Sequence, residues 1–447
     1  MSGLRRDGIS PRLKTASLGI CMVAAGCSIW ASAQVSASPK AAAENANGDI
    51  QAVTSAFPAW DSFADQLRQL GPQMLAKLPE RLRNNPQVQQ EAGRLLLAGV
   101  AAKTIEAISS DGDHPVFLPA LNVTLNVGQP NADTTYRNAI ITPGGSYRLR
   151  GERGSLRIFK LGQFGRPPAK ASAGISALAY NDFNELHLDP AGNFDVILSP
   201  TRSQGYTGDW WKLEAGTSSL LLRQVDFDWV TERDPRISIE RLDKPVERPR
   251  PDAAELETRL RNLATSIGNT AFFLVDHVEG LRRDGYINRL REFDVSHLGG
   301  LVGQFYYEGA YELAPDEGLI LEAKVPAKCT YWSVILTNDI YETTDWYNNQ
   351  SSLNGAQLRV DGDAIVRVVI SAKDPGVPNW LDTAGYPSGA IQGRWNECSA
   401  TPIPTLRKVP VTDVRQFLPV DTPKVTPAQR EERVRNRRAQ VQQRPLW

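Results

Sequence analysis

Apolar and polar positions alternate along the chain with two different periods. Over residues 60–78 and 86–110 the apolar residues recur at helical spacing, which predicts two helices. From residue 146 the pattern changes to short apolar runs separated by turn residues, which is typical of strands. Strands are therefore expected at 147–150, 156–159, 185–188, 194–198 and 220–223.

A further helical stretch separates this region from a second strand-rich region. The apolar stripe over residues 251–283 follows a Pro-Asp start signal and predicts one long connecting helix. Strand patterns then resume over 300–419. Residues 426–444 could form a basic, polar helix, and with Val434 on an otherwise charged face we expect it to be solvated or packed lightly on the surface.

The two strand-rich regions repeat one pattern. In each, an aspartate turn precedes a strand, a loop leads to a tryptophan, and a later strand carries an arginine; the corresponding residues are Asp189 and Asp361, Trp211 and Trp380, and Arg223 and Arg394. This predicts duplication of one β unit. Two antiparallel β-sandwiches are the simplest architecture, so the expected fold is mainly β with helical additions.

The first part of the chain has the pattern of a secretory signal. Basic residues precede an apolar run over 16–30 and the small residues Ala31, Ser32 and Ala33. The mature protein is expected in the periplasm or outside the cell, without a membrane span after cleavage. A lipoprotein attached through Cys27 is the alternative.

The expected segments follow from these patterns. They are a signal peptide (1–33), a flexible leader (34–57), a helical segment (58–125), the first β-sandwich module (126–245), a helical connector (246–299), the second module (300–420) and a basic tail (421–447).

Charge and cysteine content narrow the classes of partner. The chain has 50 basic and 50 acidic residues, and removal of residues 1–33 leaves 46 against 49, which argues against a nucleic-acid partner. Cys329 and Cys398 are the cysteines outside the signal region, and in an oxidising compartment such a pair favours a disulfide. Two unpaired thiols are the alternative. The sequence does not indicate an oligomeric state.

The familiar catalytic motifs are absent from the sequence. It has no Gly-x-Ser-x-Gly elbow, His-Glu-x-x-His helix, phosphate-binding glycine loop or Cys-x-x-Cys pair. The histidines are too scattered to indicate a metal site: His114, His187, His277 and His297. No cofactor is predicted. A calcium loop at residues 189–195 is the exception considered, but it lacks a closing glutamate, so a plain hairpin is favoured.

Two polar clusters are candidates for chemistry. Asn131, Asp133, Tyr136 and Arg137 place an amide, a carboxylate, a phenol and a guanidinium in a loop before the first strand, although a capped turn with a salt bridge would use the same residues. Asp228 and Glu232 could supply an acid and a base if burial separates their pKa values. An ion pair with Arg223 or Arg241 is the alternative.

The second strand-rich region is dense in aromatic residues. Because neighbouring strand side chains point to opposite faces, Tyr306 with Tyr307 and Tyr331 with Trp332 must each send one ring away from the core, into a cleft or a module interface. We expect ligand contacts from Asn131, Trp211, Arg223, Tyr331, Trp346, Asn354, Trp380, Arg394 and Trp395, with Asp382 as a further catalytic candidate. Ordinary core packing is the alternative.

Three segments, at residues 131–137, 351–354 and 374–385, resemble the domain of unknown function 1214, whose frequent N-terminal partner is the domain of unknown function 1254. The similarity covers about residues 110–420. The resemblance implies jelly-roll-like β-sandwiches with helical additions, and it implies no activity or catalytic residues.

These observations leave three functional hypotheses. The first is an enzyme, a lyase or hydrolase, that acts on a small aromatic or hydrophobic molecule bound between the β modules. The second is a carbohydrate- or envelope-binding protein without catalytic activity. The third is a structural envelope protein.

Overall fold

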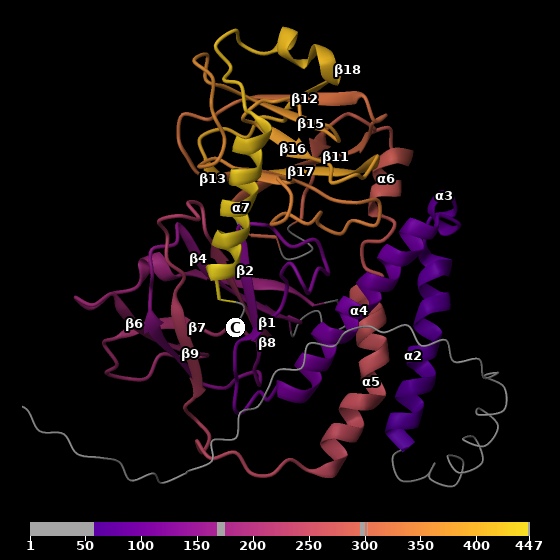
Figure 1. The fold of residues 1–447 in the computed structure, drawn as a ribbon. Coiled ribbons are helices and arrows are strands. Elements are labelled where there is room, and N and C mark those ends of the chain that lie inside the picture. Colours follow the sequence, from indigo (N-terminus) through magenta and orange to yellow (C-terminus); the bar gives the residue numbers. More distant parts are fainter. Residues whose placement is uncertain (1–57, 168–174, 296–299, 302, 446–447) are drawn as a thin grey trace, which may run out of the picture. The chain divides into compact units, whose positions relative to one another are not determined.

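The computed structural model describes residues 58–167, 175–295, 300–301 and 303–445 (Figure 1). The expected signal peptide and leader, Cys27 and His297 lie outside these residues. No helix in the described part of the chain is long and apolar enough to cross a membrane.

Three of the helices lie side by side (Figure 1): α2 (Pro58–Lys77), α4 (Pro86–Ser109) and α5 (Ala253–Ala271). The helices expected at 60–78 and 86–110 are confirmed. Asn85 begins α4 by accepting a hydrogen bond from the backbone N–H of Gln87 (3.0 Å). Buried Met74, Leu95 and Ala271 join the three helices in one apolar cluster.

Glu91 places a buried carboxyl group on α4. Its side chain is 3% exposed, and Nδ2 of Asn338 donates a hydrogen bond of 3.4 Å to it. Burial raises the pKa of Glu91 to about 7, although a hydrogen bond from Gln87 partly opposes that shift.

Glu91 should therefore make stability fall as the pH rises. The folded protein holds this proton up to about pH 7, whereas the unfolded chain releases it near the ordinary glutamate value, so the unfolding free energy decreases between about pH 4.5 and pH 7. Urea unfolding near pH 5 and near pH 8 should show a smaller decrease in Glu91→Gln than in the wild type. Glu106→Gln, on the same helix but more exposed, is the control. Equal decreases in all three proteins would contradict the assignment.

The first pair of sheets is formed by nine strands of the described chain: β1 (Leu118–Pro119), β2 (Thr134–Ile140), β3 (Tyr147–Glu152), β4 (Ile158–Gly165), β5 (Ser176–Asp182), β6 (Asn193–Ser199), β7 (Asp209–Lys212), β8 (Thr217–Val225) and β9 (Arg236–Arg241). One sheet has the order β1-β2-β8-β4-β5 and the other β7-β6-β3-β9. Side chains of both sheets meet in one core, among them Leu149, Phe159 and Leu222.

The second pair follows helix α6 (His277–Arg283) and contains β10 (Arg291–Glu292), β11 (Gln304–Glu312), β12 (Glu317–Lys324), β13 (Cys329–Leu336), β14 (Ser352–Asn354), β15 (Ile365–Ser371), β16 (Trp380–Asp382), β17 (Ser388–Cys398) and β18 (Thr405–Pro410). Its sheets have the orders β10-β11-β17-β13-β14 and β16-β15-β12-β18. Leu321, Trp332 and Trp395 belong to its core.

The two pairs of sheets are built alike, strand for strand. The orders correspond throughout, with β2 matching β11, β8 matching β17 and β6 matching β15. Both pairs contain one parallel strand pairing, β6 with β7 and β15 with β16, where the sequence predicted antiparallel strands only. The described chain is therefore mostly strands, in four sheets that form two similar pairs.

Local contacts establish which residues correspond. The backbone N–H of Asp189 donates to the carbonyl of Asn193 (3.0 Å), and that of Asp361 donates to Ile365 (2.9 Å), so the aspartate turns match as predicted.

The tryptophan match is shifted by one residue. Nε1 of Trp210 donates to Oγ of Ser199 (2.9 Å), and Nε1 of Trp380 donates to Oγ of Ser371 (3.0 Å). The strand register agrees, so Trp210 corresponds to Trp380, and the predicted match with Trp211 is wrong.

Three predicted elements differ from the structure. Residues 185–188 form no strand, because a 3-10 turn (Phe183–Glu185) precedes them and the His187 N–H donates to Asp209 (2.8 Å). The segment 131–137 is a loop only at its start, since β2 begins at Thr134. The helix expected over 251–283 is broken between α5 and α6, and the break lets Val278 and Leu281 of α6 pack against β11.

Helix α7 (Pro427–Gln443) is not the loosely packed surface helix that the sequence predicted. Arg430 donates to Asp374 (2.8 Å), Arg437 bonds the carbonyl of Trp346, and Arg444, just after the helix, pairs with Asp234 (2.9 Å). Arg430 and Arg437 are 6% and 7% exposed. An apolar stripe could not reveal this helix, because the face that it buries carries arginines.

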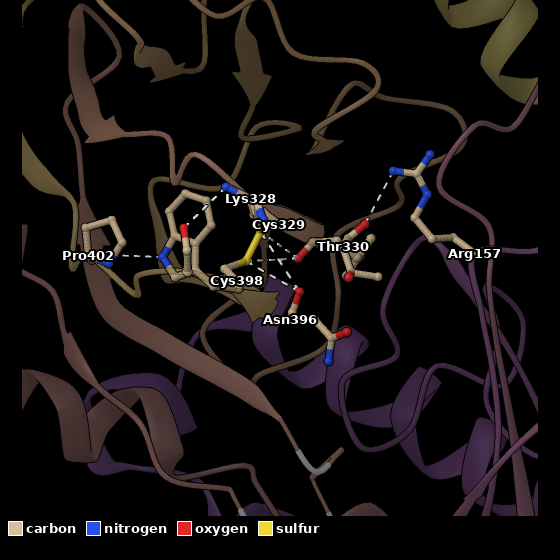
Figure 2. The surroundings of a disulfide bond; sticks show 10 residues. Arg157, Lys328, Cys329, Thr330, Asn396, Cys398 and Pro402 are labelled. Carbon is tan, nitrogen blue, oxygen red and sulfur yellow. Dashed lines mark hydrogen bonds between the residues drawn. A yellow bond between two sulfur atoms is a disulfide. The ribbon is translucent and has the colours of Figure 1, made fainter. Parts of the chain in front are cut away.

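The predicted disulfide is present between Cys329 and Cys398 (Figure 2). The two cysteines are paired residues on the neighbouring strands β13 and β17. Figure 2 also shows Arg157, just before β4, donating a hydrogen bond to the carbonyl of Thr330 on β13 (3.4 Å). This bond links the first half of the chain, with the first pair of sheets, to the second half, beside the disulfide.

Candidate functional site

A cavity of about 230 Å³ lies where the two pairs of sheets meet. Its polar lining comes from both: Gln129, Tyr136, Arg223, Tyr306, Tyr341, Gln392 and Arg394. We call this the Tyr–Arg cavity. Phe164 and Phe293 contribute apolar walls.

Each pair of sheets contributes one tyrosine and one arginine from corresponding positions. Tyr136 on β2 is the register partner of Arg223 on β8, and Tyr306 on β11 is the register partner of Arg394 on β17. The guanidinium carbons lie 5.6 Å and 5.4 Å from the centres of the respective tyrosine rings. The duplicated positions therefore place two cation–π pairs in one cavity.

Arg394 is the more deeply buried of the two arginines, with 4% of its surface exposed. Its NH2 group donates to Oε1 of Gln392 (2.5 Å), and Gln392 in turn donates to the hydroxyl of Tyr341 (2.7 Å). Among the described residues, Nε of Arg394 has no hydrogen-bond partner.

Tyr341 connects the cavity with a neighbouring pair of side chains, Glu308 and His277. Its hydroxyl lies 3.4 Å from Oε2 of Glu308, and Nε2 of His277 lies 2.8 Å from the same oxygen. Burial raises the pKa of Tyr341 well above its ordinary value, so the phenol keeps its proton and can donate a hydrogen bond.

The backbone of Tyr341 is in the left-handed region, with φ of 64°. A bulky residue rarely adopts this conformation, and such strain often marks functional sites. Here it is sustained by contacts around the ring, which packs 4.4 Å from the His277 ring.

Asp133 is the centre of a buried hydrogen-bond cluster that adjoins the cavity, since the backbone N–H of Asn131 donates to the hydroxyl of Tyr136 (3.3 Å). Its carboxylate accepts from Nε1 of Trp229 (2.9 Å), Nδ2 of Asn354 (2.9 Å) and the hydroxyl of Tyr331 (2.6 Å). Asn131 donates to the Tyr331 hydroxyl (2.8 Å). We call these five residues the Asp133 cluster. Burial raises the pKa of Asp133, although the three donors oppose that shift.

The structure therefore divides the predicted polar residues between two places. Asn131, Asp133, Tyr331 and Asn354 meet in the Asp133 cluster, while Tyr136, Arg223 and Arg394 meet in the Tyr–Arg cavity. Arg137 follows Tyr136 on β2, so its side chain leaves the opposite face of the sheet.

Asp228 and Glu232 belong to a local turn and do not line the cavity. Asp228 accepts from the hydroxyl of Thr231 (2.6 Å), and this bond lowers its pKa. Glu232 accepts from the N–H of Phe227 (2.9 Å) and pairs with Arg157 at 3.7 Å, where the sequence suggested Arg223 or Arg241. Burial raises the pKa of Asp382, which accepts from the N–H of Ala384 (2.7 Å) away from the cavity.

The predicted ligand-binding tryptophans all lie in apolar clusters. Trp211 packs 5.0 Å from Phe183, and Trp395 stacks 5.4 Å from Trp332. Trp346 and Trp380 belong to two further buried clusters. For these four residues the structure supports core packing, the alternative that the sequence left open.

The aromatic pairs alternate as strand geometry predicted. Tyr307 and Trp332 enter the core of the second pair of sheets, while Tyr306 faces the Tyr–Arg cavity and Tyr331 the Asp133 cluster.

Within the described residues, no three His, Cys, Asp or Glu side chains are grouped as a metal site would require. In the turn considered for calcium, Asp189 accepts from the N–H groups of Ala191 (2.9 Å) and Asn193 (2.8 Å). Those bonds are typical of a structural turn.

Sequence reasoning did not single out Tyr341, Glu308 and Gln392 as one group. The signal that could have located Gln392 is its place two residues before Arg394 on one strand, which puts both side chains on the same face.

Comparison with solved structures reveals a substantial likeness. A crystal structure of an uncharacterised protein from Burkholderia cenocepacia is 27% identical, with a TM-score of 0.72 over 79% of this chain and 97% of that chain. The VPA0106 protein from Vibrio parahaemolyticus is 12% identical over 71% of this chain and 98% of its own, and its TM-score of 0.40 is too low to support an argument.

None of the curated proteins matches this chain. A family model matches residues 313–389, which include the segments 351–354 and 374–385 but not 131–137. The domain of unknown function 1254 remains an expectation. The region from β12 to the start of β17 matches the family described as "Protein of unknown function (DUF1214)", which confirms the resemblance seen in the sequence.

Proposed function

We propose that this chain is an exported protein that binds a small aromatic or hydrophobic molecule in the Tyr–Arg cavity. The observation that carries the proposal is the lining of that cavity, where corresponding residues of both halves converge with aromatic walls. Ligand sites commonly combine apolar walls with a few placed polar groups, as this one does.

The proposal includes the origin and compartment of the protein. The matching strand orders support two jelly-roll-like β-sandwich modules that arose by duplication of one unit. The Cys329–Cys398 disulfide supports a periplasmic or secreted location, because such bonds persist in oxidising compartments.

Enzymatic turnover, by a lyase or a hydrolase, is the second candidate function. The observation that favours it is the row of Tyr341, Glu308 and His277. The phenol of Tyr341 is buried beside the cavity, and the backbone of this residue is in the left-handed region. The phenol lies near the carboxylate of Glu308, which contacts His277. Such a row can hold or move a proton. Glycan binding has less support, because the tryptophans expected to contact a ligand pack in cores.

The test is a thermal-unfolding screen of the mature protein with neutral and charged single-ring aromatic compounds. A compound that binds only the folded state should stabilise it by about 2.7 kcal/mol at a hundred times its dissociation constant. Leu221→Trp should abolish the stabilisation, because Leu221 lines the cavity and a larger side chain would fill it.

Leu188→Trp is the matched control, since Leu188 is exposed and lies outside the cavity. It should leave the stabilisation by ligand unchanged. Failure of every compound to shift the wild type, or an unchanged shift in Leu221→Trp, would refute the proposed site.

A further inference from the structure

The Tyr–Arg cavity carries positive charge from both halves of the chain. Arg223 and Arg394 line it, and no aspartate or glutamate is present among its described lining residues. Tyrosine and glutamine provide the other polar groups among the described lining residues. The charged groups among the described lining residues are therefore both cations.

The environment of Arg394 does not neutralise its charge. Its contacts are the amide oxygen of Gln392 and the ring of Tyr306, and it forms no salt bridge with a described residue. A buried charge is costly unless it is paired. The carboxylate of Asp133, whose charge acts on Arg394, is already engaged by three hydrogen-bond donors.

The geometry of a guanidinium favours a planar oxyanion. An arginine offers parallel N–H donors that match the two oxygens of a carboxylate, and charge-assisted bonds of this kind are stronger than neutral ones. With Nε of Arg394 lacking a partner in the described chain, one donor remains for such an anion.

The size and walls of the cavity define the remainder of the ligand. A cavity of about 150 Å³ can hold benzene, so about 230 Å³ can hold one ring with a small substituent. Phe164 and Phe293 supply apolar surface for the ring.

We infer that the ligand of the Tyr–Arg cavity is a single-ring aromatic carboxylate, whose carboxylate group is bound by Arg394 and Arg223 and whose ring packs on the aromatic walls. This inference rests on the proposed function, because it names the ligand class of the same cavity.

The experiment compares ligands of one shape and different charge. Isothermal titration calorimetry of the wild-type mature protein near pH 7 would use benzoate, benzamide, benzylamine and phenyl phosphate as probes. Benzoate should bind at least about tenfold more tightly than benzamide, because a hydrogen bond to a charged group contributes more than a neutral one. Benzylamine, a cation, should not bind.

A matched pair of variants tests whether the charge of Arg394 binds the carboxylate of the ligand. Arg394→Gln should weaken benzoate binding at least about tenfold and leave benzamide binding nearly unchanged. Arg407→Gln is the control, because Arg407 also lies over an aromatic ring, that of Phe417 at 5.2 Å, but outside the cavity. It should bind benzoate as the wild type does.

The possible failures are distinguishable. If no probe binds, the proposed function itself fails. If benzamide or benzylamine binds as tightly as benzoate, the cavity binds aromatics but the anionic ligand class is wrong. Tighter binding of phenyl phosphate would overturn the assignment to carboxylates. Because these comparisons use the wild type, they decide the inference even if Arg394→Gln does not fold.

Discussion

Replacement of Asp133 by alanine is expected to lower the unfolding free energy by at least about 3 kcal/mol, because three buried donors then lose their acceptor at about 1–3 kcal/mol each. The donors belong to Trp229, Tyr331 and Asn354, so the loss affects both halves of the chain. Urea-induced unfolding followed by tryptophan fluorescence and by circular dichroism would measure it.

Asp228→Ala is the control for this prediction. Asp228 is also an aspartate of the first half, but its bonds are confined to its own turn, so the loss should stay near 1 kcal/mol or below. Equal effects of the two substitutions would show that the Asp133 cluster does not hold the halves together.

Removal of the disulfide by Cys329→Ser with Cys398→Ser should cost about 4 kcal/mol. The bond closes a loop with a sequence separation of 69 residues, and the chain-entropy model assigns a cost of this size to opening it. The unfolding free energies of oxidised wild type and double variant, measured in the same buffer, would give the difference.

Reduction provides the second arm of this experiment. A reducing agent should lower the stability of the wild type toward that of the double variant and leave the variant unchanged. If the two proteins are equally stable before reduction, the disulfide makes no net contribution to folding.

Much of the fold could be predicted because its signals are local. The helices before residue 110 follow from apolar spacing, and the two turns from the side chains of Asp189 and Asp363, which bond nearby backbone. The segment 185–188 has the period of a strand, but the His187 contact with Asp209 is a tertiary interaction that periodicity cannot show. The same limit explains the shifted tryptophan, since Trp210 and Trp211 are equivalent until their hydrogen bonds are known.

The candidate site was only partly predictable. Arg223 and Arg394 were recognised as corresponding residues, but nothing in the sequence places them in one cavity, because their distance depends on how the halves pack. Asp133 and Tyr136 are three residues apart and belong to different sites. Side chains alternate between the two faces along a strand, and this alternation separates the two residues. Composition cannot reveal which face each side chain takes.

Arg444, just after α7, also affects the order in which the protein can fold during synthesis. Arg444 supplies the donors for Asp234 and for the carbonyl of Asp133, both of which lie in the first half of the chain. The ribosome makes α7 after both pairs of sheets, so until that helix emerges these acceptors must be satisfied by water. The nascent first half is therefore expected to remain locally hydrated and open at this edge, and to close only when Arg444, just after α7, docks.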